Sequence, residues 1–131
     1  MIKTIHFPKI IDERGNLTFL QNKDQVPFDI KRVFWTYDVP GGEFRGGHAS
    51  KSLDEVVIAV SGSFDIVVTD KRCIQTRYSL NRSYFGLFLP KGTWRQIENF
   101  STNAVSLHIC SNLFDESDYV RNFEDFKMFK L

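Results

Sequence analysis

The chain is poor in cysteine and in long apolar runs, and neither sign of charge dominates it. Its two cysteines, Cys73 and Cys110, are too few for a disulfide framework and fit no zinc-ligand spacing, so both are expected to be reduced. No apolar run of about 18 residues is present, so no transmembrane helix is expected. A net charge of +1 gives no basis for binding nucleic acid or a membrane surface. The N-terminal residues lack the apolar core of a signal peptide, and the expected compartment is the cytoplasm.

Aromatic residues, by contrast, are abundant. Thirteen of the 131 residues are Phe, and the aromatic share is 15%. A chain of this length predicts a single domain, residues 1–131, that is large enough for one core. The aromatic content suits the filled interior of a β-barrel.

Strand signals cover most of the chain. Short β-branched and aromatic segments recur at intervals of about ten residues with turn signals between them, which is typical of an all-β sandwich or barrel. The expected strands are 32–39, 55–60, 63–69, 73–80, 84–89, 95–100 and 104–110. One helix is expected near the C-terminus, capped by Asp115 and docked on the barrel through Tyr119, Phe123, Phe126 and Phe129.

The most specific pattern runs from Gly42 to Gly62 and reads GEFRGGHASKSLDEVVIAVSG. It resembles the first signature of the cupin barrels, with His48 and Glu55 at ligand positions. The segment 90–99 resembles the second signature. A metal-binding cupin has a second histidine where this chain has Ser50, and a last histidine where it has Arg95.

These two replacements predict that the chain needs no metal. A catalytic divalent ion usually takes three or more protein ligands, whereas His48 and Glu55 supply two. A serine hydroxyl is a poor ligand, and the guanidinium of Arg95 cannot coordinate a cation and repels one. Arg95 indicates instead a pocket for an anion such as a phosphate, a carboxylate or an enolate.

Over almost its whole length the chain resembles the WxcM-like sugar 3,4-ketoisomerases, small cupins that act on dTDP-4-keto-6-deoxyglucose. The likeness is carried by IIDERGNLTFL, VPFDIKRVFWTYDVPGGEFRGGHASK, AVSGSFDIVV, GLFLPKGTWRQIENFS and FDESDYVRNFEDF, of which RGGHASK and DESDYVRN are the specific blocks. The resemblance implies an all-β cupin double-stranded β-helix, which is a jelly-roll barrel, with a short C-terminal α-helix. It also implies an intertwined homodimer, no metal and a dTDP-linked keto sugar as the ligand.

The reaction that the resemblance implies moves a proton between C3 and C4 of the sugar through an enediolate, as a step in deoxyamino-sugar biosynthesis. It needs a base of near-neutral pKa and a donor or cation beside the enediolate, and it needs no cofactor. His48 is the only histidine inside a motif, and we predict that it is the base. Tyr37 is a candidate donor. His6 is expected to be a surface residue on an edge strand, and His108 to be a satisfied core histidine.

Five residues are predicted to contact the substrate: Arg14, Arg45, Ser50, Lys51 and Arg95. Four of them are cations, which suits a ligand with two phosphates. The resemblance implies that the positions of Arg14 and Arg95 border the sugar. Family members have a second histidine at the position of Ser50, and three explanations are open. Ser50 relays a proton or binds water, the protein is a weak or altered catalyst, or this copy carries a substitution.

Two other functions are compatible with the motifs. A non-catalytic cupin that binds a nucleotide sugar would have the same fold and the same cations. A 3,5-epimerase of the same sugar would rely on a histidine–aspartate pair and a well-placed tyrosine, and the motifs of that family differ from RGGHASK.

Overall fold

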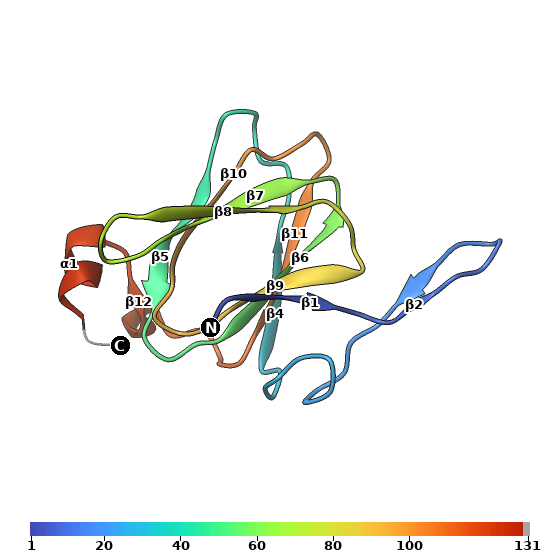
Figure 1. Ribbon diagram of the computed structural model, residues 1–131, viewed down its shortest axis with the longest axis horizontal. Coiled ribbons are helices and arrows are strands. Elements are labelled where there is room, and N and C mark those ends of the chain that lie inside the picture. The colour runs from blue at the N-terminus through green and yellow to red at the C-terminus, as the bar shows by residue number, and fades with distance from the viewer. Residues whose placement is uncertain (130–131) are drawn as a thin grey trace.

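Antiparallel strands dominate the regular secondary structure of the computed structural model, which describes residues 1–129 (Figure 1). Two five-stranded sheets face each other, with the strand orders β1–β9–β6–β11–β4 and β12–β5–β10–β7–β8. The first sheet consists of β1 (Lys3–His6), β9 (Phe85–Leu89), β6 (Glu55–Ser61), β11 (Val105–Cys110) and β4 (Arg32–Thr36). The second consists of β12 (Tyr119–Val120), β5 (Arg45–Ser50), β10 (Trp94–Glu98), β7 (Phe64–Thr69) and β8 (Gln75–Leu80). The all-β architecture predicted from the sequence is confirmed.

The space between the sheets is divided into an apolar part and a polar part. Side chains alternate between the two faces of a strand, so every second residue points inward. The apolar part is filled by Val57, Ala59, Phe64, Ile66, Val68, Leu80, Leu87, Leu89, Ile97 and Ala104. The polar part lies where inward-facing charged side chains of β5, β6, β10 and β11 meet, and it forms the cavity described below.

The outer faces of both sheets are partly covered. Phe7, Val26 and their neighbours pack on Val56, Ile58 and Ile109 of the first sheet. On the second sheet, the helix α1 (Phe123–Met128) packs Phe126 against Ala49 and Val120. Within residues 1–129, no helix is long and apolar enough to cross a membrane.

The C-terminal segment differs from the single helix expected from Asp115. Asp115 does act as a cap, because its side chain accepts a hydrogen bond from the Ser117 amide, but the turn it caps is the 3₁₀-helix η1 (Glu116–Asp118). The chain then extends into β12, so Tyr119 lies on a strand, and α1 starts anew with Asn122 as its own cap. The aromatic residues Phe123 and Phe126 dock on the barrel as expected.

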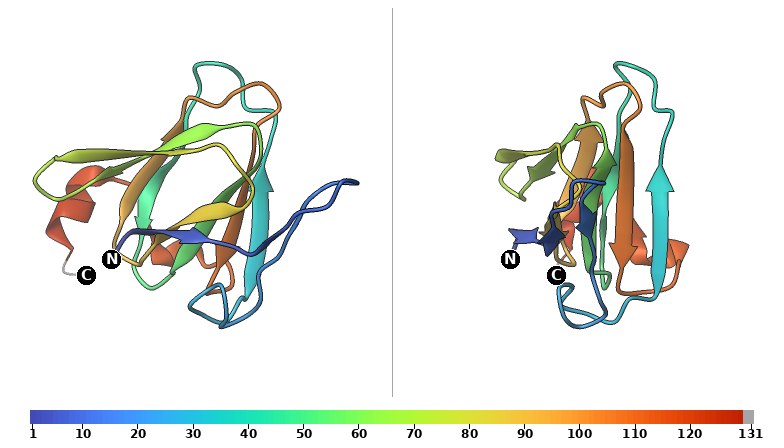
Figure 2. Two further views of the ribbon diagram at one scale, coloured as in Figure 1. Left: turned by 45° about the vertical axis from the view of Figure 1, so that its right-hand side comes forward. Right: turned by 90° about the vertical axis from the view of Figure 1, so that its right-hand side faces the viewer.

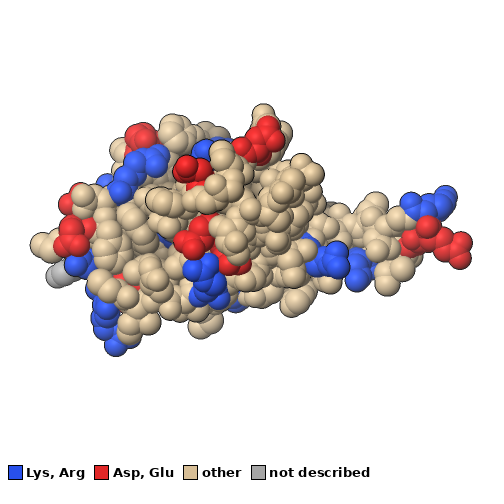
Figure 3. Space-filling view, turned by 90° about the horizontal axis from the view of Figure 1, so that it is seen from above, with Lys and Arg blue, Asp and Glu red and all other residues tan. Residues whose placement is uncertain are grey.

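Strands β2 (Lys9–Ile10) and β3 (Leu17–Thr18) form a two-stranded arm, which we define as residues 9–18. The arm projects away from the two sheets, on the side opposite α1 (Figures 1 and 2). Seen from above, acidic and basic side chains are interspersed over the molecule, and both signs occur at the end of the arm (Figure 3). The apolar side chains of Ile10, Ile11 and Leu17 are exposed on it.

Gly62 of the first cupin signature is required by close packing as well as by its backbone conformation. Its φ is +64°, and a Cβ there would lie 2.8 Å from the Cα of Ala104 and 2.5 Å from the Oγ of Ser101. We expect Gly62→Ala to lower the free energy of unfolding by about 2–4 kcal/mol, since backbone strain and overpacking add. Urea denaturation measures the loss. Gly41→Ala is the matched control, because nothing lies within 4 Å of its added methyl group; an equal loss in both variants would contradict this reading.

Candidate functional site

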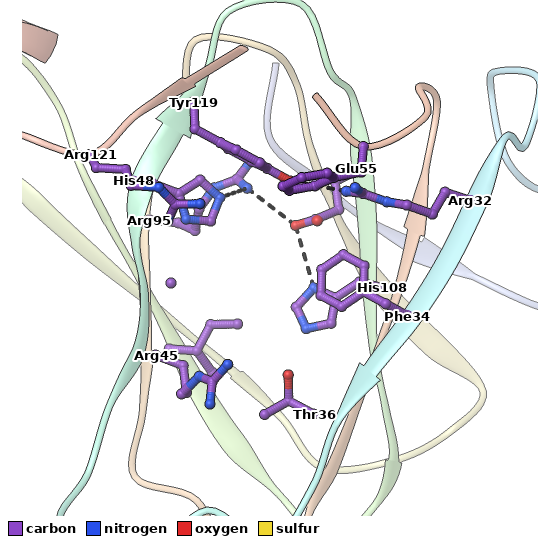
Figure 4. A pocket seen from close by; sticks show the side chains of 13 residues that line it. Arg32, Phe34, Thr36, Arg45, His48, Glu55, Arg95, His108, Tyr119 and Arg121 are labelled. Carbon is purple, nitrogen blue, oxygen red and sulfur yellow. Dashed lines mark hydrogen bonds and ion pairs between the residues drawn. The ribbon is translucent and has the colours of Figure 1, made fainter. Parts of the chain in front are cut away.

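A cavity of about 420 Å³ lies between the two sheets (Figure 4). The first sheet contributes side chains from β4, β6 and β11, and the second from β5, β10 and β12. The lining residues are Arg32, Phe34, Thr36, Arg45, Gly46, His48, Glu55, Arg95, Ile97, His108, Phe114, Tyr119 and Arg121. Among them Glu55 is the only acid, beside four arginines, so the cavity favours an anionic ligand.

His48 and Arg95 are cross-strand neighbours. They are paired in register across β5 and β10, with a register shift immediately after Arg95. The Nη1 of Arg95 donates to the Nε2 of His48 over 3.2 Å. Because a guanidinium can only donate, Nε2 is the acceptor, and the neutral ring carries its proton on Nδ1. The lone pair of the imidazole and a permanent cation therefore lie side by side.

Glu55 anchors the same guanidinium from the opposite sheet. Its Oε1 accepts from the Nη1 of Arg95 at 3.2 Å and lies 3.5 Å from the Nδ1 of His108. All three side chains are almost completely buried, Arg95 to 1% exposure. The Nε and Nη2 atoms of Arg95 have no hydrogen-bond partner within the described residues. Buried donors without partners are costly, which makes them candidates for contact with a ligand.

The charges around the cavity fix the protonation states of these groups. Burial, and then the charge of Arg95, lowers the pKa of His48 to about 3. Burial is the largest single influence on Glu55 and would raise its pKa, but Arg95, His108 and His48 together outweigh it, and the pKa is lowered to about 2. At neutral pH the cavity thus holds a neutral imidazole, a carboxylate and a guanidinium.

A second polar cluster lies at the edge of the cavity. The Nη2 of Arg32 donates to the phenol oxygen of Tyr119 at 3.0 Å and contacts the Sγ of Cys110 at 3.6 Å. The ring of Tyr119 packs edge-on against His48, with 4.9 Å between ring centroids. Burial raises the pKa of the Cys110 thiol to about 12, so this sulfur stays protonated.

His108 is held on three sides. Its ring stacks on Phe34 with 4.3 Å between centroids, and its Nε2 is 2.9 Å from the Oγ of the fully buried Ser106. The sequence-based expectation of a buried histidine agrees with this position, but the ring also lines the cavity and faces Glu55. His6, the third histidine, lies exposed on the edge strand β1, as expected.

Three of the predicted site residues, His48, Arg45 and Arg95, line the cavity together. Ser50 and Lys51 do not. Ser50 is fully buried and its hydroxyl has no hydrogen-bond partner within the described residues. The amine of Lys51 donates instead to the carbonyl of Ser117. The geometry of the single chain thus gives neither residue a path to a ligand in the cavity.

Tyr37 and Arg14 also lie outside the cavity of their own chain. Residues of β4 alternate, so Phe34 and Thr36 line the cavity while Trp35 points outward; Tyr37, which follows β4, is 60% exposed and does not line the cavity. Arg14 lies in the turn of the arm, its side chain 89% exposed and paired with Asp12 at 2.8 Å. If either residue contacts a ligand in such a cavity, the cavity belongs to another copy of the chain.

The sequence interpretation missed Arg32 and Tyr119 as cavity residues. Arg32 opens a strand that was recognised, and the alternation from Phe34 would have placed it on the same face. Tyr119 belongs to the specific DESDYVRN block, but the helix expected there would place its ring against the barrel and not in the cavity. The pairing of Tyr119 with Ser50 across β12 and β5 is what brings the phenol to the cavity.

The donor set does not suit a metal ion. Within residues 1–129, no three His, Cys, Asp or Glu side chains come together as a metal site would require. The guanidinium of Arg95 occupies the space between His48 and Glu55, where it would repel a divalent cation.

The lowered pKa of His48 predicts how stability depends on pH. The unfolded chain takes up a proton on this residue near pH 6.5, whereas the folded chain does so only near pH 3. The unfolded state therefore binds more protons between these values, and stability falls as the pH is lowered from 7 to 5. The slope from this residue cannot exceed about 1.4 kcal/mol per pH unit, because the folded and unfolded states differ by at most one proton at this site.

The measurement is urea denaturation at pH 7, 6 and 5. The His48→Asn variant serves as the comparison, because it removes the titrating ring at little cost in volume. We expect its stability to depend less on pH over this range than that of the unchanged chain. Identical slopes would show that the folded and unfolded forms of His48 titrate alike.

Comparison with known proteins places these features in a family. Residues 1–130 match the family model described as FdtA, WxcM-like, C-terminal. A curated relative, the TDP-4-oxo-6-deoxy-α-D-glucose-3,4-oxoisomerase of Aneurinibacillus thermoaerophilus, is 36% identical over 127 residues, which is 97% of this chain and 91% of the relative.

Solved structures agree with this assignment. The TDP-quinovose 3,4-ketoisomerase WlaRB of Campylobacter jejuni is 38% identical, with a TM-score of 0.92 and 98% of each chain covered. The 3,4-ketoisomerase QdtA of Thermoanaerobacterium thermosaccharolyticum, solved with TDP, is 33% identical, with a TM-score of 0.94 over 97% of this chain and 92% of that one. A dTDP-4-dehydrorhamnose 3,5-epimerase of Bacillus anthracis, at 18% identity and a TM-score of 0.78, shares the fold alone.

The resemblance and the cupin-like barrel predicted from the sequence are therefore confirmed. The chain belongs to the WxcM-like FdtA family, together with the TDP-sugar 3,4-ketoisomerases.

Proposed function

We propose that this chain is a 3,4-ketoisomerase that converts TDP-4-keto-6-deoxyglucose into a TDP-3-keto-6-deoxyhexose, a step in deoxyamino-sugar biosynthesis. The observation that carries the proposal is the neutral imidazole of His48 held against a buried guanidinium in an arginine-lined cavity. The family relatives that carry this activity in their names support the choice of substrate. The cytoplasmic location expected from the sequence stays a prediction.

In this proposal His48 moves the proton between the two carbons. Its Nε2 lone pair accepts from the Nη1 of Arg95 in this structure; once that donor turns to a substrate oxygen, Nε2 takes the proton from C3 and the same nitrogen returns it to C4. Arg95 lies at hydrogen-bond distance from Nε2, so its unpartnered donors are close to the oxygen that gains negative charge in the enediolate. The negative charge of the enediolate and the positive charge of the imidazolium form together. Their attraction offsets the cost of placing each charge in the buried cavity.

The diphosphate of the substrate suits the outer part of the cavity. Arg45 and Arg121 line it, and both are exposed enough to meet phosphate oxygens. Arginine binds phosphate through paired, charge-assisted hydrogen bonds, which fix orientation as well as adding affinity. Lys51 and Ser50 were also predicted to contact the substrate; their positions beside the cavity wall give that prediction no support.

The function is tested by incubating the protein with TDP-4-keto-6-deoxyglucose in deuterated water and following C3, C4 and C5 by NMR. Signals of a 3-keto sugar are expected, with the same rate in the presence of a chelator. Deuterium at C5 would indicate a 3,5-epimerase. Binding of the nucleotide sugar without any exchange would indicate a non-catalytic binding protein, and either result would overturn the proposal.

We also propose that the protein is an intertwined homodimer. The arm (residues 9–18) exposes Ile10, Ile11 and Leu17, and a two-stranded ribbon is marginally stable in water by itself. The edge strand β4 exposes Trp35 on its outer face, and Tyr37, which follows β4, is also exposed; the two are 58% and 60% accessible. A second copy would cover both surfaces, and the arm is the segment that would bring Arg14 to the cavity of that copy.

The dimer prediction is checked by light scattering at micromolar concentration, where twice the chain mass of 15.3 kDa is expected. Trp35→Glu should shift the mass toward the monomer, because it places a charge on the face to be covered. Ile74→Glu is the control, since Ile74 is similarly exposed, 53%, but lies in the turn before β8. A monomeric mass for the unchanged chain would contradict the proposal.

Replacing His48 tests its role as the base. We expect His48→Asn to lower turnover by roughly 10²–10⁴, the usual effect of removing a general base, and to leave the affinity for TDP nearly unchanged. Isothermal calorimetry with TDP and the NMR assay give the two quantities. Ser50→His, which restores the histidine of the family pattern, should keep or raise activity. Near-normal turnover in His48→Asn would mean that the base lies elsewhere.

A further inference from the structure

The proposed isomerisation moves two protons, and His48 accounts for one of them. While the carbon proton passes from C3 to C4, O4 must gain a proton and O3 must lose one. In this chain the second motif position is Ser50, whose buried hydroxyl does not line the cavity. A different group has to transfer the proton to O4 and from O3. This inference rests on the function proposed above.

Tyr119 is the cavity residue best placed for this task. It lies on β12 beside β5, and its ring contacts the edge of His48 at 4.9 Å between centroids. Figure 4 shows the phenol extending over the cavity from His48 toward Arg32. The guanidinium of Arg121 lies 4.8 Å from the ring centroid and is itself held by Glu116, so the ring is supported from its other side.

The hydroxyl of Tyr119 is oriented by its one polar partner. The Nη2 of Arg32 donates to the phenol oxygen at 3.0 Å, and a guanidinium cannot accept a hydrogen bond. The phenolic proton is therefore not used in this contact, and it has no acceptor among residues 1–129. It is free to be donated to a ligand oxygen. Arg32 would also offset the negative charge that the phenol oxygen gains when its proton leaves.

Other hydroxyl and imidazole groups of the cavity are less suited. The Nε2 of His108 lies 2.9 Å from the Oγ of Ser106. Its Nδ1 makes no hydrogen bond within the described residues, but the Glu55 carboxylate lies 3.5 Å away and competes with a ligand oxygen for the Nδ1 proton. Thr36 lines the cavity, but an aliphatic hydroxyl is a poor proton donor without a partner that activates it, and within the described residues it makes no side-chain hydrogen bond. Tyr37 follows β4 and does not line the cavity.

We propose that Tyr119 is a second catalytic residue, which carries the proton between O4 and O3. As Nε2 of His48 removes the C3 proton, the C3–H pair becomes the C3=C4 bond, and the C4=O4 π pair takes the phenolic proton to give the enediol. The phenolate then accepts the O3 proton, the O3–H pair forms C3=O3, and the C3=C4 pair takes the proton back from His48 at C4. Both residues end as they began.

The test compares Tyr119→Phe with the unchanged chain in the NMR assay and in calorimetry with TDP. Turnover should fall at least 100-fold, while the dissociation constant for TDP changes less than threefold. Tyr78→Phe makes the same chemical change outside the cavity and should leave both values unchanged. Tyr119→Phe with more than a third of the normal turnover overturns the proposal, and so does a parallel loss of TDP binding, which indicates a structural role.

Two further measurements complete the experiment. Tyr37→Phe is measured alongside, and loss of turnover there with an active Tyr119→Phe would assign the donor role to Tyr37 and overturn the proposal. If Tyr119→Phe does not fold, Arg32→Gln replaces it; we expect at least a tenfold loss of turnover with TDP binding retained, and normal turnover overturns the proposal. An unchanged chain that binds TDP but isomerises nothing instead refutes the proposed function itself.

Discussion

The buried guanidinium of Arg95 is the group on which the rest of the cavity depends. It takes a place where the cupin pattern has a metal ligand, and it connects the two sheets through His48 on one side and Glu55 on the other. Removing one member of a buried charge pair typically costs roughly 3–5 kcal/mol, because the remaining charge is left without compensation. Glu55 must therefore stay ionised for Arg95 to stay in place.

The same guanidinium connects the fold to the chemistry. Burial, and then the charge of this cation, keeps the neighbouring imidazole neutral, and the guanidinium has donors free for the site where an enediolate would form. A metal ion would supply a similar positive charge, but it would also need ligands that this chain does not bring together within residues 1–129. The positive charge thus lies where the cupin pattern has its metal site, but a guanidinium carries it instead of a metal ion.

Much of the fold and part of the site could be predicted from the sequence. The alternation of apolar residues and the regular turn signals identified an all-β barrel, and the two cupin signatures placed His48 and Arg95 on strands that pair. The alternation rule also places Trp35 and Tyr37, two residues apart, on the same face of the chain, and both are exposed. Alternation alone does not identify which face of the strand points into the barrel, because the opposite face also carries an aromatic residue, Phe34.

Tyr119 could not be placed from local pattern for a different reason. Asp115 and the aromatic spacing after it favour a helix, and the cap does form, but a second cap at Asn122 competes with it four residues before Phe126. Between the two caps the backbone gains more by pairing with β5 than by continuing the helix. That choice depends on a strand about 70 residues away, and no local window contains it.

The two cysteines differ so strongly in their surroundings that they differ in reactivity. Cys110 is fully buried, and its pKa of about 12 leaves almost no thiolate at neutral pH. Cys73 is exposed, in the turn between β7 and β8, where its φ of +67° marks a tight bend. Because thiolates rather than thiols react with alkylating reagents, modification of the folded protein will be confined to Cys73. The chain therefore carries a single natural attachment point for a spectroscopic label, outside the cavity and in the turn whose Lys71 lies over the Phe126 ring of α1.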